Sequence, residues 1–145
     1  MQYILLPSTD TPLQTMKEIL VPISPGELLD KITILEIKSE RIDDPDKVAN
    51  VRHELGLLSR VWSDSVEEDQ TISDLHRQLK AINEELWEIE DDIRDEERND
   101  RFDERFIELA RAVYVTNDKR AQAKKDVNLH LGSEIVEEKS YKDYS

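Results

Sequence analysis

The sequence predicts an all-α protein, a four-helix bundle with one long antiparallel helical hairpin and a short extended N-terminal arm. The composition is the first reason: 37% of the 145 residues are charged, 6% are aromatic and three are glycine, which is typical of long solvated helices. The second is that apolar residues recur every three or four positions in four stretches, each flanked by helix start or stop signals. A chain of this length forms one domain. We place that domain at residues 16–145, with residues 1–15 as a leader or arm.

The N-terminal region predicts extended backbone. Residues 4–7 (ILLP) nearly repeat residues 19–22 (ILVP), and both are apolar runs that end in proline. Proline cannot donate to a sheet ladder, so such segments suit only a sheet edge. The two segments could therefore pair with each other or between subunits.

The first two helices have clear start signals. Ser24 is followed by Pro25 and by Glu27, which together form an N-cap, a first-turn proline and a capping box. This helix is expected to run to about residue 42, where Asp44 and Pro45 begin the second. The second helix carries an apolar stripe that we interpret as core: Val48, Val51, Leu55, Leu58 and Trp62.

The third and fourth helices form the predicted hairpin. After a polar loop at about residues 63–70, seven apolar residues alternate steps of three and four, which is the heptad seam of a coiled coil: Ile72, Leu75, Leu79, Ile82, Leu86, Ile89 and Ile93. Asn99 and Asp100 interrupt the pattern. The fourth helix then runs from about residue 102 to residue 131 and ends at Gly132.

The first helix is apolar on two flanks. Leu28, Ile32 and Leu35 share one face, whereas Ile34 and Ile37 lie opposite. Such a helix is either central in the bundle or part of a dimer interface. A homodimer is therefore predicted, either through this helix or through the seam.

The fourth helix carries an unusual stripe. At 100° per residue, seven residues fall within about 40° of one line along the helix, and the first three are apolar whereas the last four are polar. They are Phe106, Ala110, Val113, Asn117, Arg120, Lys124 and Asn128. A buried unpaired charge costs several kcal/mol, about the stability of a small domain, so the polar members need partners.

Hairpin geometry limits where those partners lie. Residue numbers that face each other across the hairpin should add to about 200, which places Arg120 near Lys80 and Lys124 near His76, not near an acid. The balancing charge must come from the first helix, or from an anion in solution. The predicted ligand-binding set is Asn117, Arg120, Lys124, Asn128, Glu27, Asp30, Lys31 and Glu36, with Glu40 as a further acid of the first helix.

Charge and composition exclude several classes of function. The net charge of −14 argues against nonspecific nucleic-acid binding. The sequence has no cysteine, and it contains neither a signal peptide nor an apolar run long enough for a membrane span. These observations predict a cytoplasmic protein without membrane contact.

Catalytic motifs are weak or missing. Glu85, Glu88 and Asp91 sit at helical spacing suited to Mg²⁺, as in all-α nucleotide pyrophosphohydrolases, but this spacing arises by chance in so acidic a segment. No GxSxG motif, phosphate-binding glycine loop or HExxH motif occurs. We therefore predict no metal site and no cofactor, and whether the protein is an enzyme stays open.

Three segments resemble an uncharacterised family of short bacterial helical proteins known as a domain of unknown function. They are residues 21–42 (VPISPGELLDKITILEIKSERI), residues 83–94 (NEELWEIEDDIR) and residues 106–141, which include TNDKR. The resemblance covers essentially everything after Met16. It implies that GELLDK and TNDKR belong to one unit, but it brings no known activity, cofactor or catalytic residue.

Two functional hypotheses follow. The leading one is a noncatalytic helical interaction or adaptor protein with a central polar network. The alternative is a binding protein or enzyme for a small anionic ligand that uses Arg120 and Lys124. The Mg²⁺-dependent pyrophosphohydrolase is a third.

Overall fold

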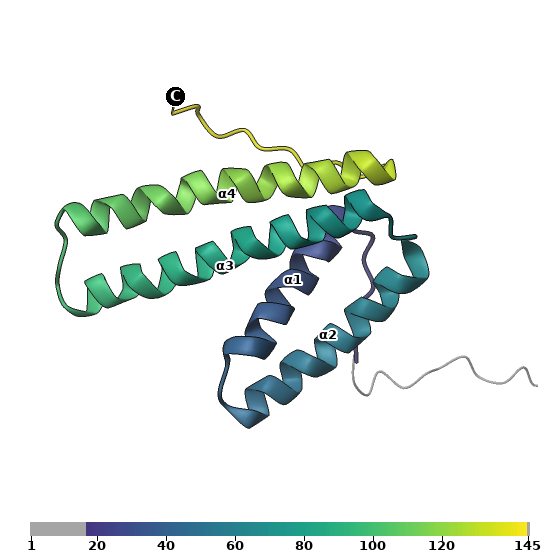
Figure 1. Cartoon of the computed structure of the whole chain (residues 1–145), viewed down its shortest axis with the longest axis horizontal. Coiled ribbons are helices and arrows are strands. Elements are labelled where there is room, and N and C mark those ends of the chain that lie inside the picture. Colours follow the sequence, from purple (N-terminus) through teal and green to yellow (C-terminus); the bar gives the residue numbers. More distant parts are fainter. Residues whose placement is uncertain (1–16, 145) are drawn as a thin grey trace, which may run out of the picture.

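The computed structural model describes residues 17–144 and confirms the all-α class. Within these residues there are four helices and no strand: α1 (Pro25–Arg41), α2 (Pro45–Ser65), α3 (Gln70–Arg98) and α4 (Glu104–Leu131). The four helices form two hairpins, α1–α2 and α3–α4, which meet at one end and splay apart at the other (Figure 1). None of the described helices is long and apolar enough to cross a membrane.

The helix ends follow from capping chemistry. The Ser24 hydroxyl accepts a hydrogen bond from the Glu27 amide at 3.2 Å, and Asp44, Asp69 and Asp103 cap the next three helices through their carboxylates. Gly132 ends α4 with a φ of 65°, a backbone conformation that glycine adopts without steric cost.

The α3–α4 hairpin has the register that the sequence predicted. Side-chain hydrogen bonds across it join residues 116 and 85, 105 and 92, and 130 and 69. In each pair the two residue numbers add up to within three of 200. Most buried residues of α4 lie, however, beside the stripe identified in the sequence. They are Leu109, Thr116, Ala123 and Val127, and Asn128 is the one stripe residue that is buried with them among those described.

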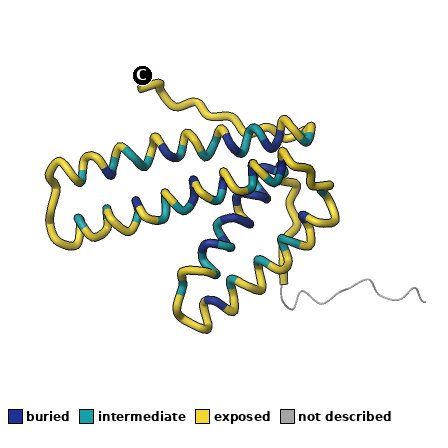
Figure 2. The backbone as a smooth tube through the Cα atoms, in the orientation of Figure 1, coloured by how far each residue is buried: buried dark blue, intermediate teal, exposed yellow. Residues whose placement is uncertain are grey.

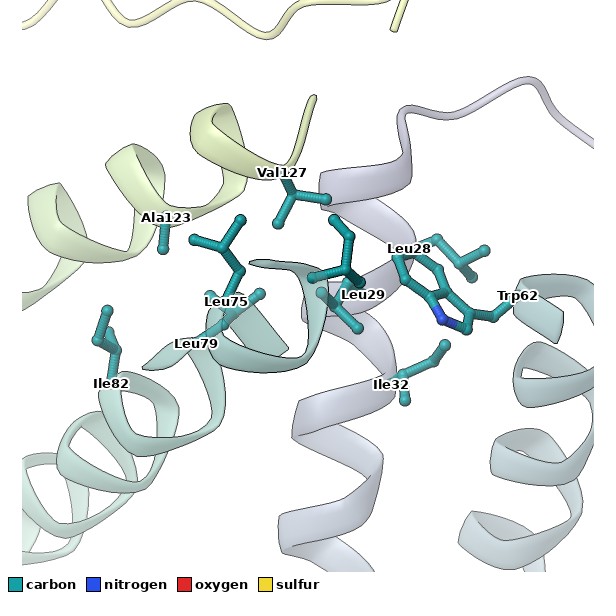
Figure 3. Close-up of a cluster of buried hydrophobic side chains, with 10 residues drawn as sticks. Leu28, Leu29, Ile32, Trp62, Leu75, Leu79, Ile82, Ala123 and Val127 are labelled. Carbon is teal, nitrogen blue, oxygen red and sulfur yellow. The ribbon is translucent and has the colours of Figure 1, made fainter. Parts of the chain in front are cut away.

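The core lies where the two hairpins meet. Leu29 of α1, Trp62 of α2, Leu79 of α3 and Val127 of α4 all belong to one buried cluster (Figure 3). Figure 2 shows the buried residues gathered at this junction and along α1, whereas the far ends of both hairpins are mostly exposed. The core therefore fixes one end of each hairpin.

Helix α1 is the central element. It packs against α2, α3 and α4, whereas α2 packs against α1 alone among the helices. Ile37, on the second flank of α1, is 1% exposed. Of the two interpretations of the double apolar face, the structure supports a central position, with Ile37 buried and Ile34 half-buried on the second flank.

Three expectations about the N-terminal half need correction. Residues 19–22 form no strand but an irregular segment with exposed side chains, and residues 4–7 lie outside the described range. The loop before α3 is shorter than predicted, because α2 continues to Ser65. The stripe of α2 is only partly core: Val48 and Trp62 are buried, whereas the residues between them are half-buried, since one helix alone covers this face.

Candidate functional site

The centre of the polar network is an ion pair between α1 and α4. The Arg120 guanidinium binds both carboxylate oxygens of Asp30, with Nε at 2.8 Å from Oδ1 and Nη2 at 2.5 Å from Oδ2. Asp30 is 1% exposed. A two-point guanidinium–carboxylate contact fixes orientation as well as charge, so this pair sets how α4 crosses α1.

Helix α3 provides an uncharged hydrogen-bond donor to the same carboxylate. The Asn83 side-chain amide donates to Asp30 Oδ1 at 2.9 Å and to Thr33 Oγ1 at 3.0 Å, and the Thr33 hydroxyl donates to the Asp30 carbonyl at 2.8 Å. Asn83 and Thr33 are buried. The charge of Asp30 is therefore shared between a cation from α4 and an amide from α3.

The start of α1 lies directly on the backbone of α4. The Gly26 amide donates to Asn128 Oδ1 at 2.7 Å, and a Cβ at position 26 would overlap the carbonyl oxygen of Lys124. Only glycine allows two backbones to approach so closely. This contact explains the glycine in the GELLDK segment.

Lys124 joins three elements. Its ammonium lies 2.6 Å from Glu27 Oε2 of α1 and 3.0 Å from Glu137 Oε2 of the C-terminal tail, which we define as residues 133–144. The Lys124 side chain is 12% exposed and that of Glu137 is 62% exposed. The pair with Glu27 is thus inside the network, whereas the pair with Glu137 is at its surface.

A second group of charges joins α1 to α3. Glu36 Oε1 lies 2.6 Å from His76 Nε2, and Lys80 Nζ lies 2.6 Å from Glu40 Oε1 and 3.8 Å from Glu36 Oε2. Glu36 therefore balances cations of α3, not those of α4. The acids of α1 are divided, with Glu27 and Asp30 serving α4 and Glu36 and Glu40 serving α3.

The electrostatics of these groups follow from their partners. The hydrogen bond to Asp30 raises the pKa of Arg120 in spite of burial. Burial is the largest influence on Lys124 and acts to lower its pKa, but the contacts with Glu27 and Glu137 outweigh it, so that pKa is raised too. The contact with Glu36 raises the pKa of His76, and the contact with Glu40 raises that of Lys80. In each case the raised pKa favours the charged form of the group.

Two residues of the predicted set stand apart from the network. Lys31 is exposed and makes no ion pair with any described residue. Asn117 is half-buried, and its side-chain amide has no hydrogen-bond partner within residues 17–144. Asn117 lines both hollows of the surface described below.

Sequence reasoning missed three members of the network. Gly26, Thr33 and Asn83 were not among the residues predicted for the site. Asn83 could have been found from the sequence, because it is an amide at a buried position between Leu79 and Leu86 of the seam. Nothing in the tail pointed to Glu137.

Two hollows border the network. The tail pocket, of about 1060 Å³, lies between α4 and the C-terminal tail, with Tyr114, Lys125 and Lys142 among its lining residues. The hairpin groove, of about 420 Å³, lies where α1 diverges from the α3–α4 hairpin, and its apolar lining comprises Ile34, Ile37, Leu86 and Trp87. Arg120 borders both.

The part of the chain that the structure describes contains no cluster of potential metal ligands. No three acidic or histidine side chains gather there as potential ligands, and Glu85 contacts Thr116 at 3.4 Å. Within the same residues every buried side-chain nitrogen and oxygen has a hydrogen-bond partner. The buried polar groups of the network thus bond to one another, which is the arrangement expected of residues that hold helices together.

Comparisons with known proteins give a family and no activity. A family model described as "Family of unknown function (DUF6165)" matches residues 19–144. No curated protein and no solved structure matches the chain. The chain belongs to this family of unknown function, which covers all four helices and the tail.

Proposed function

We propose, for this member of a family of unknown function, a noncatalytic interaction protein that binds a positively charged amphipathic helix of a partner in the hairpin groove. The observation that carries the proposal is that α1 fills the groove between α3 and α4 only near the core and then diverges from it (Figure 1). Beyond that point, within residues 17–144, Leu86 and Trp87 of the hairpin line an open groove and are only half-buried.

The apolar lining supports a helical occupant. Trp87 and Leu86 of α3 and Ile34 of α1 are each half-buried in the groove. On α4, Phe106 and Ala110 of the stripe are also half-buried, farther along the hairpin and outside the groove. Grooves of this kind take the apolar face of an amphipathic helix, and a tryptophan is a common anchor of such contacts.

The charge of the hairpin favours a cationic occupant. Residues 84–118 contain 14 acidic and five basic residues, a net charge of −9. A field of that sign attracts positive partners and repels negative ones. The groove itself is lined by Glu90 and Asp91 beside Lys38, Arg94 and Arg120. The attraction for a basic amphipathic helix therefore comes from the acidic hairpin around the groove, and its apolar lining receives the apolar face.

The proposal is tested with two fluorescently labelled 18-residue peptides of identical leucine and lysine content. One places leucine at helical spacing and the other alternates leucine and lysine, so only the first can present an apolar helical face. Fluorescence anisotropy should give at least about tenfold tighter binding of the first peptide, about 1.4 kcal/mol. Equal affinities would mean that charge alone attracts them and would contradict the proposal.

Matched variants locate the binding site. Leu86→Asn, in the groove, should weaken binding of the helical peptide about tenfold, whereas Leu57→Asn should not, because Leu57 is an exposed leucine of α2 outside the groove. Circular dichroism checks that both variants fold. In a Trp62→Phe background, Trp87 is the single tryptophan, and its emission should shift to shorter wavelength as the peptide covers it.

A second candidate function is binding of a small anion by Arg120 and Lys124. One observation favours it, since both side chains border the tail pocket. Each is already bound to a carboxylate of α1, so an anion on these two residues would have to compete with Asp30 and Glu27. Neither catalysis nor a Mg²⁺-dependent hydrolase has an observation of this kind behind it.

A further inference from the structure

The C-terminal tail encloses the tail pocket. It runs back along α4 (Figure 1), and an ion pair of 3.2 Å joins Lys139 to Asp118. Near its end, the Tyr144 and Tyr114 rings make an edge contact with centroids 5.1 Å apart. Helix α4 is thus the floor of the pocket and the tail is its outer wall.

The pocket contains positive charge that residues 17–144 do not neutralise. Its lining has five basic and four acidic residues, in a chain whose net charge is −14. Lys125 and Lys142 make no ion pair with any residue in the described range, whereas Lys124 and Lys139 do. Two cations are therefore available to a ligand without breaking the network.

The other lining groups suit a flat ring. Tyr114, Tyr141 and Tyr144 supply aromatic surface, and Lys139 lies 5.5 Å from the centroid of Tyr141. The free side-chain amide of Asn117 offers both a donor and an acceptor. Pockets that combine apolar walls with a few polar groups of this type orient small organic ligands.

We propose that the tail pocket binds a ring-bearing organic phosphate of about the size of a nucleoside phosphate. Lys125 and Lys142 contact the phosphate, Asn117 orients the ligand, and the tyrosines pack against the ring. Arg120 and Lys124 stay with Asp30 and Glu27 as the rigid base of the site. This site goes beyond the interaction function and shares only Asn117 and Arg120 with the lining of the hairpin groove.

Glu137 competes with the ligand in this arrangement. Its carboxylate is on the tail, is largely exposed and lies 3.0 Å from Lys124. It therefore holds negative charge inside a pocket that must accept an anion. Replacing it with glutamine keeps the size of the side chain and removes that charge.

The test uses isothermal titration calorimetry on the full chain with four probes. ADP carries both ring and phosphate, adenosine only the ring, ribose 5-phosphate the charge without an aromatic ring, and inorganic phosphate the charge alone. ADP should bind at least about tenfold more tightly than each of the others, because it alone satisfies both halves of the pocket. No measurable heat with ADP, or equal affinity for inorganic phosphate, would overturn the proposal.

Variants separate this site from nonspecific attraction of anions. Lys142→Ala should weaken ADP binding about fivefold, and Lys119→Ala should leave it unchanged, because Lys119 is an exposed lysine of α4 outside the pocket. Glu137→Gln should tighten binding about threefold. Equal losses in both lysine variants, or weaker binding in Glu137→Gln, would contradict the assignment. Since Lys119, Glu137 and Lys142 are exposed, their replacement leaves the core intact.

Discussion

At the scale of single residues, Gly26 decides how closely α1 and α4 approach. We expect Gly26→Ala to destabilise the protein by about 2 kcal/mol or more, because overpacking against backbone cannot relax by rotating a side chain. The new methyl group would meet the Lys124 carbonyl and lie 2.9 Å from Asn128 Oδ1. Urea unfolding followed by circular dichroism measures the loss.

A second glycine serves as the matched control. Gly56 is also helical, but a Cβ there meets nothing within 4 Å. Gly56→Ala should therefore stabilise the protein by about 0.5–1 kcal/mol through the better helix propensity of alanine. The contact argument fails if both substitutions shift the urea midpoint in the same direction.

The residue types predicted which charged side chains needed partners, but they did not predict which residue each one would pair with. The stripe pointed to Arg120 and Lys124, and the register excluded α3 as their source of acid, which left α1. Periodicity cannot say which acid faces which cation when Glu27, Asp30, Glu36 and Glu40 lie within four turns of one helix. That choice depends on the crossing angles of α1 with α3 and α4, which are properties of the packed molecule.

At the scale of elements, the contact between α1 and α3 makes stability depend on pH. Glu36 raises the pKa of His76 above its ordinary value of 6.5, with Glu68 acting in the same direction and Lys80 opposing it. A group whose pKa is higher in the folded state stabilises that state while it is protonated. The stabilisation is complete below pH 6.5 and is lost as the pH rises through the higher pKa of the folded protein.

The measurement compares wild type with His76→Gln in urea from pH 5 to pH 9. The difference in unfolding free energy between the two proteins should decrease as the pH rises across this range. His53 provides the control, because it is exposed on α2 and makes no ion pair with any described residue. A pH-independent difference for His76→Gln would show that the contact with Glu36 does not depend on the charge of His76.

Helix boundaries with strong start or stop signals were predicted closely, and boundaries without such signals were not. The Ser24 cap and Gly132 placed the start of α1 and the end of α4 correctly. Ser63 to Ser65 were assigned to a loop because they are polar and lead into acids, yet they extend α2. The Trp62 indole, which donates to Glu68 at 2.7 Å, closes this turn by a contact that composition does not reveal.

At the scale of the whole molecule, the homodimer stays a prediction: Ile37 of α1 is buried within the chain, whereas Ile34 on the same flank is only half-buried. One surface open to such a dimer is the outer half of the α3–α4 hairpin, where Phe102 and Ile107 are exposed. Pairing two such halves brings together two segments that each carry a net charge of −9 (14 acidic and five basic residues). Like charges oppose that association, and salt screens the repulsion.

Ionic strength therefore separates the two modes of association. Light scattering should give a dimer mass that increases in abundance from about 50 mM to 500 mM salt, since the Debye length falls from roughly 14 Å to roughly 4 Å. Binding of the cationic helical peptide should weaken over the same range, because salt screens attraction as well. Ile107→Glu adds charge at an exposed apolar residue in the outer half of α4 and should abolish the dimer, whereas Val61→Glu, at an exposed valine of α2, should not. A dimer that dissociates as salt increases would mean that opposite charges hold the subunits together, and would place the interface away from this acidic half of the hairpin.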